Sequence, residues 1–334
     1  MDIQTLTKVA NVMVSPGKGI LAIDESHPTC KKRFEKLGVE FTEENRRAYR
    51  ELLITAPGTE QYLSGMILFD ETIRQKTSDG TPFSEVLKRK GIIPGIKVDA
   101  GTKELELYPG EKITEGLDGL AERLKEYIAL GAKFAKWRAV ITVGPKIPTS
   151  ACIKANAQAL AQYAAICQEL NVVPIVEPEI LIDGDHTIER CYEVCAATWD
   201  MIFAELAEQG IALAGMILKT SMVLSGKDNP AQASTEEIAR LTVKCLKEHV
   251  PHSLAGVVFL SGGQDDEDAT IRLNAMHRLG EMLPWPLSFS YGRGIQNPAL
   301  KIWATDKTKI KEAQVALLER ARANALASRG KYKL

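Results

Sequence analysis

The sequence predicts an α/β fold, a (β/α)8 barrel of the TIM type with additional N- and C-terminal helices. Three observations lead to this fold class. Eight short apolar runs bounded by glycine or proline recur along the chain, stretches with helical periodicity lie between most of them, and no low-complexity linker interrupts the pattern. Because barrels of this type are often long single domains, residues 1–334 are expected to form one domain.

The eight apolar runs have the length and composition of parallel strands buried on both faces. They cover residues 17–24, 64–70, 91–99, 133–140, 171–180, 213–223, 254–263 and 286–294. In (β/α)8 enzymes the active site lies at the carboxyl ends of the strands. The polar residues that end these runs are therefore the first candidates for a functional site.

Capping residues indicate where the intervening helices begin. Thr42 precedes EENRRAYRELL, Ser150 precedes ACIKANAQALAQYAAICQEL, and Ser234 opens a segment with capping-box spacing. The additional helices are expected before the first strand, over residues 3–14, and after the last, over roughly residues 308–327.

The charge balance argues against two classes of partner. Charged residues make up 25% of the chain and the net charge is −1, so no overall field attracts nucleic acid or an acidic membrane surface. No apolar run approaches the roughly 18 residues of a membrane span, and the first residues lack the apolar core of a signal peptide. The sequence predicts a soluble, cytoplasmic protein.

Six cysteines show neither Cys-x-x-Cys nor paired Cys/His spacing. They are Cys30, Cys152, Cys167, Cys191, Cys195 and Cys245. Small buried thiols on helix faces account for them better than disulfides or metal ligands, and they fit a reducing compartment.

Lys219 lies near the end of an apolar run, LAGMILKTSMV, that contains no acidic residue. At its ordinary pKa a lysine is the free amine in only about one molecule in 2,500 at pH 7. Apolar surroundings and a second cation could lower that pKa by roughly three units, which would make imine formation with a carbonyl practical. The alternative is a strand-end lysine whose stem covers apolar surface while its head reaches water.

Seven of the eight runs end in groups suited to acid, base or anion chemistry. These groups are Asp24; Lys97 and Asp99; Lys136 and Arg138; Glu177 and Glu179; Lys219; Ser261, Gly262 and Gly263; and Ser290, Gly292, Arg293 and Gly294. Residues two apart on a strand share a face, so each charged pair can point into the barrel mouth. Taken singly, each group could be an ordinary polar strand end.

Position alone does not select a nucleophile among Lys97, Lys136 and Lys219. Lys97 is followed two residues later by Asp99, which favours the ammonium form, and Lys136 by Arg138, which suggests a cationic role. Lys219 has no charged neighbour on its own face, so its desolvation is expected to be the least compensated.

Two glycine loops follow the seventh and eighth runs, where barrel enzymes often hold phosphate. Ser261, Gly262 and Gly263 precede a predicted helix, whose first N–H groups can face an oxyanion. The other loop contains Arg293, which can bind phosphate through two parallel hydrogen bonds. A tight turn is the alternative for either loop alone.

No metal site is expected. The five histidines do not fall on the strand ends, and no His-x-x-x-His pair is present. The segment DGDH at 183–186 could hold a cation, but a polar turn that opens the next helix explains it more simply.

Several segments together resemble the class I fructose-bisphosphate aldolases, from about residue 3 to Tyr332. These are GILAIDES (19–26), TEENRRAYRELL (42–53), FAKWR (134–138), VPIVEPEIL (173–181), DGDH (183–186), FLSGGQ (259–264) and FSYGR (289–293). The resemblance implies reversible, metal-independent cleavage of fructose 1,6-bisphosphate to dihydroxyacetone phosphate and glyceraldehyde 3-phosphate in glycolysis and gluconeogenesis. It also implies no cofactor and a homotetramer.

The resemblance implies a role for each matching residue. Lys219 matches the Schiff-base lysine, Glu177 the general acid/base, and Asp24 the carboxylate that handles the C4 hydroxyl. Lys136 and Glu179 match neighbours that assist imine formation. Two further sets match the C1-phosphate site (Ser261, Gly262, Ser290, Gly292 and Arg293) and the rest of the substrate with its other phosphate (Ser26, Arg33, Lys97 and Arg138).

The chain departs from the family in two places. Animal members carry a flexible tail with a terminal tyrosine, whereas Tyr332 lies close to the last predicted helix. Thr220 and Ser221 follow the lysine where the family commonly has proline and asparagine. Another Schiff-base barrel, such as deoxyribose-phosphate aldolase or transaldolase, and a catalytically idle scaffold that binds partners remain alternatives.

Overall fold

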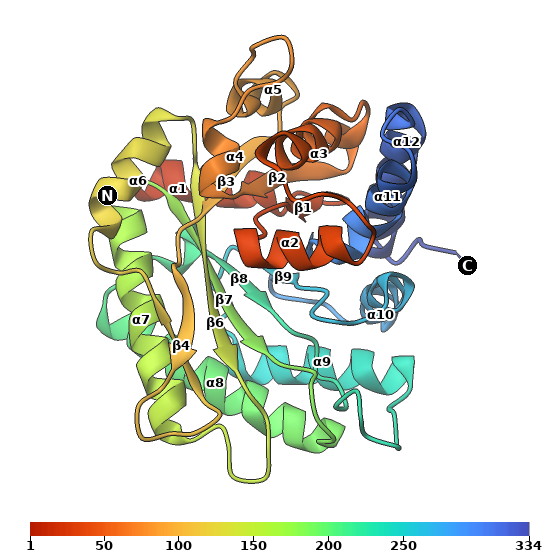
Figure 1. The fold of residues 1–334 in the computed structure, drawn as a ribbon. Coiled ribbons are helices and arrows are strands. Elements are labelled where there is room, and N and C mark those ends of the chain that lie inside the picture. Colours follow the sequence, from red (N-terminus) through yellow and green to blue (C-terminus); the bar gives the residue numbers. More distant parts are fainter. Residues whose placement is uncertain (334) are drawn as a thin grey trace.

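The computed structural model describes residues 1–333 and contains a closed barrel of parallel strands in the order β1-β10-β9-β8-β7-β6-β3-β2. Helices surround the barrel on its outside (Figure 1). The barrel strands are β1 Gly19–Ala22, β2 Leu63–Leu68, β3 Ile93–Lys97, β6 Phe134–Ile141, β7 Val173–Ile180, β8 Ile217–Thr220, β9 Gly256–Phe259 and β10 Leu287–Tyr291. All eight predicted strands are confirmed, mostly with narrower bounds.

The helices that follow the strands cover the outer face of the barrel, and the first helix of the chain closes one end of its interior. Their bounds are α1 Ile3–Met13, α2 His27–Glu35, α3 Glu43–Thr55, α4 Asp70–Arg74, α5 Phe83–Arg89, α6 Leu120–Ala129, α7 Ser150–Glu169, α8 Ile188–Glu208, α9 Thr235–His249, α10 Asp266–Arg278, α11 Arg293–Thr305 and α12 Ile310–Ala327. The two additional helices predicted from the sequence are therefore α1 and α12.

Side-chain caps mark the starts of five helices, α1, α3, α7, α8 and α9. The Thr42 side chain accepts the backbone N–H of Asn45, and Ser234 accepts that of Glu237 at 3.2 Å, as predicted. For α7 the prediction was wrong by one residue. Thr149 is the N-cap, because its hydroxyl accepts the N–H of Cys152, and Ser150 is already helical.

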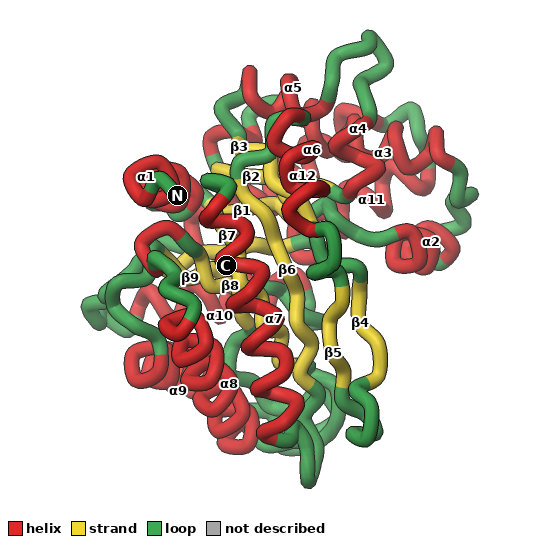
Figure 2. The backbone as a smooth tube through the Cα atoms, turned by 90° about the vertical axis from the view of Figure 1, so that its left-hand side faces the viewer, coloured by secondary structure: helices red, strands yellow, loops and turns green. Residues whose placement is uncertain are grey.

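Three elements were not predicted as the structure has them. An antiparallel hairpin, β4 Gly101–Glu104 with β5 Lys112–Glu115, lies beside β6 (Figure 2). Helix α11 follows β10 directly, and the start of the sixth predicted strand is a short 3-10 turn, Leu213–Gly215.

Two apolar layers share the core because side chains alternate across each strand. One layer packs the outer face of the barrel against the helices. The other fills the lower part of the interior and is closed by Leu6, Ala10 and Met13 of α1. The Phe134 ring fits inside because Gly95 has no side chain, and a Cβ there would lie 2.2 Å from the ring. The interior is therefore closed at the end covered by α1.

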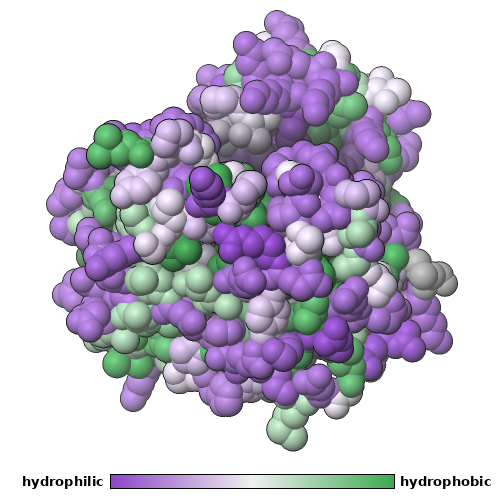
Figure 3. All heavy atoms as spheres, turned by 90° about the horizontal axis from the view of Figure 1, so that it is seen from below, coloured by the Kyte–Doolittle hydropathy of each residue, from purple (hydrophilic) through white to green (hydrophobic). Residues whose placement is uncertain are grey.

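The outer surface is mostly hydrophilic, and hydrophobic residues are scattered over the face seen in Figure 3. The large hydrophobic side chains that are exposed include two on α1 (Ile3 and Val12) and two on α12 (Ile310 and Val315). No helix within residues 1–333 is long and apolar enough to cross a membrane.

Candidate active site

Four predicted residues meet inside the barrel near the carboxyl ends of the strands. Glu177 is at the centre, with Oε1 3.0 Å from Nζ of Lys219 and Oε2 3.2 Å from Nζ of Lys136. The Lys136 ammonium also lies 2.7 Å from Oδ2 of Asp24. Lys136, Glu177 and Lys219 are only 3%, 3% and 4% exposed. The result is a buried row of alternating charge, which we call the lysine–carboxylate row.

Strand alternation places these groups in the interior. Phe134, Ile175 and Ile217 belong to the apolar layer inside the barrel, and Lys136, Glu177 and Lys219 each follow one of them by two residues. The residues between them face the helices; Trp137 and Leu218, for example, pack in the outer layer. The lysine–carboxylate row therefore rests on a dry apolar floor.

The register of the strands does not by itself predict the contacts. The Cα of Lys136 pairs with that of Ile175, yet its ammonium contacts Glu177, two residues further along β7. Arg138 pairs through its Cα with Glu177, yet its guanidinium contacts Glu179. Both cations thus reach toward the open end of the barrel and meet the next carboxylate on the neighbouring strand.

Attraction between the ammonium and carboxylate groups determines the protonation states in the lysine–carboxylate row. Burial alone would raise the pKa of Asp24, but the ammonium groups of Lys136 and Lys219 outweigh burial and lower it to about 2. The pKa of Glu177 is likewise lowered, against burial, by Lys136 and Lys219. Burial would lower the pKa of Lys136, yet Asp24 and Glu177 raise it well above its ordinary value. Both carboxylates and Lys136 are therefore ionised at neutral pH.

One argument for selecting Lys219 as the nucleophile was wrong. The sequence suggested that Lys219 lacks a charge partner, but Glu177 from the adjacent strand supplies one at 3.0 Å. The predicted partner of Lys97 is confirmed, since Asp99 lies 2.5 Å from its ammonium. The difference that remains is that two carboxylates hold Lys136 whereas one, Glu177, contacts Lys219.

Arg138 and Glu179 form a second ion pair closer to the surface. Burial would lower the pKa of Arg138, but Glu179 raises it above its ordinary value. The backbone N–H of Arg138 donates to Oδ2 of Asp99 at 3.2 Å, which ties this pair to Lys97. Asp99 therefore contacts two predicted substrate-binding residues, although the sequence indicated only its pairing with Lys97.

The two glycine loops come together next to Glu179. Gly262 and Gly263 have φ values of +39° and +88°, a conformation that side chains disfavour. A Cβ on Gly262 would lie 3.6 Å from Oε1 of Glu179, and one on Gly294 would lie 3.5 Å from Cβ of Ser261. The loops after β9 and β10 thus border the same mouth as the lysine–carboxylate row.

The two glycine loops each lead into a helix, and the two helix starts differ in charge. Asp265 occupies the N-cap position of helix α10 without a side-chain capping hydrogen bond, and Asp266, Glu267 and Asp268 lie in the first turn. The N-terminus of α10 therefore already has negative charge. Helix α11 begins at Arg293, immediately after Gly292, with no acidic residue in its first turn. The N–H groups suited to an anion are therefore those of α11.

Ser290 and Arg293 have side chains whose polar groups suit an anion. Within residues 1–333 the Ser290 hydroxyl has no hydrogen-bond partner, although Ser290 is only 1% exposed. Arg293 is exposed at the start of α11. Both flank Gly292, the N-cap of that helix.

Ser26 and Arg33 do not contact the lysine–carboxylate row. The Arg33 guanidinium contacts Glu25 and donates to Oε1 of Gln296 at 3.1 Å. Glu25 also lies 2.8 Å from the buried Arg50, and Ser26 faces Thr29 at 3.2 Å. This network beyond β1 was missed by the sequence, although Glu25 directly follows Asp24.

The cysteines and the segment 183–186 have the geometry that the sequence suggested. All six cysteines are free and buried. In the segment 183–186, Asp183 contacts Lys227 and the Gly184 N–H donates to Asp228, as expected of a structural turn. Within residues 1–333 no group of three or more His, Cys, Asp or Glu side chains is arranged to hold a metal ion.

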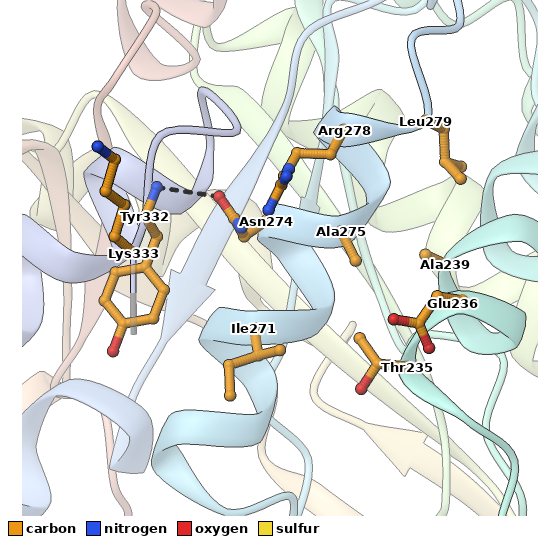
Figure 4. A pocket seen from close by; sticks show the side chains of 10 residues that line it. All are labelled: Thr235, Glu236, Ala239, Ile271, Asn274, Ala275, Arg278, Leu279, Tyr332 and Lys333. Atoms are coloured by element: carbon orange, nitrogen blue, oxygen red, sulfur yellow. Dashed lines mark hydrogen bonds between the residues drawn. The ribbon is translucent and has the colours of Figure 1, made fainter.

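Two hollows of about 640 and 650 Å³ lie away from all these residues. The first lies between α9, α10 and the end of the chain (Figure 4). There the Tyr332 N–H donates to Oδ1 of Asn274 at 3.0 Å, and its hydroxyl donates to Oε1 of Glu267 at 3.3 Å. Tyr332 is therefore held against α10, outside the lysine–carboxylate row.

Comparisons with known proteins show which family this chain resembles. The family model described as fructose-bisphosphate aldolase class-I, glycolytic, matches residues 5–334. The chain is 60% identical over 334 residues, all of both chains, to a probable fructose-bisphosphate aldolase class 1 of Xanthomonas campestris. It is 49% identical to the cytosolic fructose-bisphosphate aldolase 4 of Arabidopsis thaliana, covering 99% of this chain and 85% of that protein.

A solved structure gives the same result for the fold. Fructose-bisphosphate aldolase from Plasmodium falciparum, solved in complex with TRAP and a small-molecule inhibitor, is 47% identical and superposes with a TM-score of 0.97. The match covers 99% of this chain and 96% of that one.

Proposed function

Because this chain belongs to the class I fructose-bisphosphate aldolase family and is a lyase, we propose that it cleaves fructose 1,6-bisphosphate through a Schiff base on Lys219. The products are dihydroxyacetone phosphate and glyceraldehyde 3-phosphate, and the reaction is reversible and metal-independent. One observation carries the mechanism: the Lys219 amine lies 3.0 Å from Glu177 in a buried site that also holds Lys136 and Asp24.

The first half of the reaction forms the electron sink. Lys219 attacks the C2 carbonyl after giving up a proton, and Glu177 is within reach to accept it. Loss of the C2 oxygen as water gives a protonated imine. Lys136 remains an ammonium ion throughout, because two carboxylates hold its proton. It therefore stabilises the ionised carboxylates and is not itself the nucleophile.

The second half breaks the bond between C3 and C4. A carboxylate, Asp24 or Glu177, takes the proton of the C4 hydroxyl, and the electrons of the C3–C4 bond move into the imine. Glyceraldehyde 3-phosphate leaves, the resulting enamine is protonated at C3, and water releases dihydroxyacetone phosphate from Lys219. The same carboxylates serve the reverse direction.

Two sets of groups serve the two phosphates. We assign the C1 phosphate to Ser261, Gly262, Gly263, Ser290, Gly292 and Arg293, supported by the open N-terminus of α11 and the unpaired Ser290 hydroxyl. The other phosphate belongs with Lys97 and Arg138, and more distantly with Ser26 and Arg33. Comparing turnover of fructose 1-phosphate with that of the bisphosphate measures what this second set contributes.

The cellular setting follows from the relatives. Two plant relatives are named as cytosolic or cytoplasmic enzymes, so we place this enzyme in the cytoplasm, in glycolysis and gluconeogenesis. We propose that residues 1–334 act as one catalytic domain and assemble as a homotetramer, as the family resemblance implies.

The decisive experiment is chemical trapping. Sodium borohydride added with dihydroxyacetone phosphate should reduce the imine to a stable secondary amine, and peptide mass spectrometry should map the adduct to Lys219. An adduct on Lys97 or Lys136, or none at all, would overturn the proposed mechanism.

A further inference from the structure

The backbone pairing between β7 and β8 stops next to Glu177 and Lys219. Backbone pairing between these strands covers Ile175 with Ile217 and Val176 with Leu218, and within residues 1–333 it extends no further. Pro178, two residues later on β7, has no N–H to donate to a ladder. Regular pairing between the two strands therefore ends immediately before Glu177 and Lys219.

Ser221 supplies the missing connection. Its hydroxyl accepts the backbone N–H of Ile180 at 3.0 Å and donates to the carbonyl of the same residue at 2.9 Å. The N–H and C=O of one strand residue point toward the same neighbouring strand, so this single hydroxyl satisfies both groups that Ile180 presents to β8. Ser221 and Ile180 are each only 4% exposed, so water cannot readily replace the contact.

The other side of this strand end is also fixed. The Thr220 hydroxyl accepts the indole N–H of Trp199 on α8 at 3.1 Å. The Leu260 N–H donates to the Thr220 carbonyl at 2.9 Å, which joins β8 to the segment after β9. Toward β7, the Thr220 hydroxyl also donates to the Pro178 carbonyl, at the long distance of 3.5 Å. Ser221 therefore makes the shorter hydrogen bonds between this strand end and β7, at 2.9 and 3.0 Å.

We propose that Ser221 is a positioning residue whose hydroxyl joins the ends of β7 and β8 and thereby holds the Lys219 amine against the Glu177 carboxylate. Ser221 follows Lys219 by two residues, and Ile180 follows Glu177 by three. The inference rests on the proposed function, because it matters only if proton transfer between these two groups is part of the reaction.

Removal of the hydroxyl should affect turnover more than substrate binding. In Ser221→Ala the buried N–H and carbonyl of Ile180 lose their partner, and the two strand ends are free to separate. A displacement of about 1 Å between reacting groups can cost on the order of a hundredfold in rate. Ser221 makes no contact with the phosphate-binding loops in the contacts described above, so KM for the bisphosphate should change little.

The test compares Ser221→Ala with Ser225→Ala. Ser225 lies in the same segment after β8, is 3% exposed, and accepts one backbone N–H, that of Ala233, at 3.3 Å. We expect Ser221→Ala to lower kcat and the single-turnover cleavage rate about ten- to a hundredfold with KM within about threefold of the parent. Ser225→Ala should leave both rates within about twofold of the parent.

Folding is checked by circular dichroism and thermal melting. If Ser221→Ala does not fold, Ser221→Cys carries the test, because a thiol keeps the volume but is a weak donor and acceptor; it should show the same fall in kcat. Unchanged kcat, a loss that resides in KM, or an equal fall in Ser225→Ala would overturn the inference. Absence of a borohydride adduct in the unaltered enzyme would instead overturn the proposed function.

Discussion

The carboxylate of Glu177 contacts the ammonium of Lys219 at 3.0 Å, and both side chains are almost completely buried. Because its other oxygen faces Lys136 at 3.2 Å, Glu177 is shared between two amines. The Glu177 carboxylate can accept a proton from Lys219. The Lys136 ammonium favours the ionised form of Glu177 and so returns it to that form after each transfer. The two lysines therefore have different expected roles: Lys219 is the nucleophile and Lys136 is a permanent cation.

Lys219→Met should abolish cleavage and borohydride trapping, whereas Lys136→Ala should slow cleavage and still give an adduct on Lys219. Removing Lys136 leaves Asp24 and Glu177 buried without their shared ammonium, so Lys136→Ala should also be destabilised by about 3–5 kcal/mol. Mass spectrometry of the reduced complexes and urea unfolding measure the two effects. Lys133→Ala is the control, since Lys133 is exposed just before β6. A trapped adduct in Lys219→Met would refute the assignment.

Arg293→Ala should raise KM for phosphorylated ketoses by one to two orders of magnitude, roughly 1.5–3 kcal/mol, the scale of a hydrogen bond to a charged group. Because Arg293 is exposed at the start of α11, its loss should not change thermal stability. Steady-state kinetics are compared with those of Arg322→Ala, an exposed arginine of α12. Unchanged kinetics would remove Arg293 from the phosphate site.

Chelation should leave activity unchanged. In the proposed mechanism the protonated imine on Lys219 accepts the electrons of the broken bond, so no Lewis acid is required. The assay measures cleavage before and after prolonged treatment with EDTA. Loss of activity that Zn²⁺ restores would overturn the Schiff-base mechanism.

Asp24→Asn should change how stability depends on pH. The pKa of Asp24 is lowered from 3.8 to about 2 in the folded state, so its ionisation stabilises the fold above pH 4, and this contribution is lost as the pH falls toward 2. The shift corresponds to about 2 kcal/mol. Asparagine does not titrate in this range.

The measurement is the free energy of unfolding of both proteins, from pH 6 down to the lowest pH at which both remain folded. The difference between Asp24→Asn and the parent should be largest above pH 4 and should shrink below it. A difference that stays constant across this range would show that Asp24 is not held ionised by its neighbours.

Much of the fold could be predicted because its signals are local. Apolar runs bounded by glycine or proline located all eight barrel strands, and Thr42 and Ser234 marked helix starts through contacts within three residues. The hairpin β4–β5 was missed because its strands are short and largely exposed, so they lack an apolar run. The alternation of side chains along a strand, with a period of two residues, also predicted that Lys136 and Glu177 face the interior.

The sequence by itself determined which side chains point into the barrel, since that depends only on alternation along each strand. The tertiary structure alone decided which charges meet. The stagger between β6 and β7 brings Lys136 to Glu177 and Arg138 to Glu179, each two residues beyond its backbone partner. The closed barrel likewise joins Ser221 to Ile180 across 41 residues of sequence. Such contacts depend on how the strands are offset when the barrel closes, and no local pattern encodes that offset.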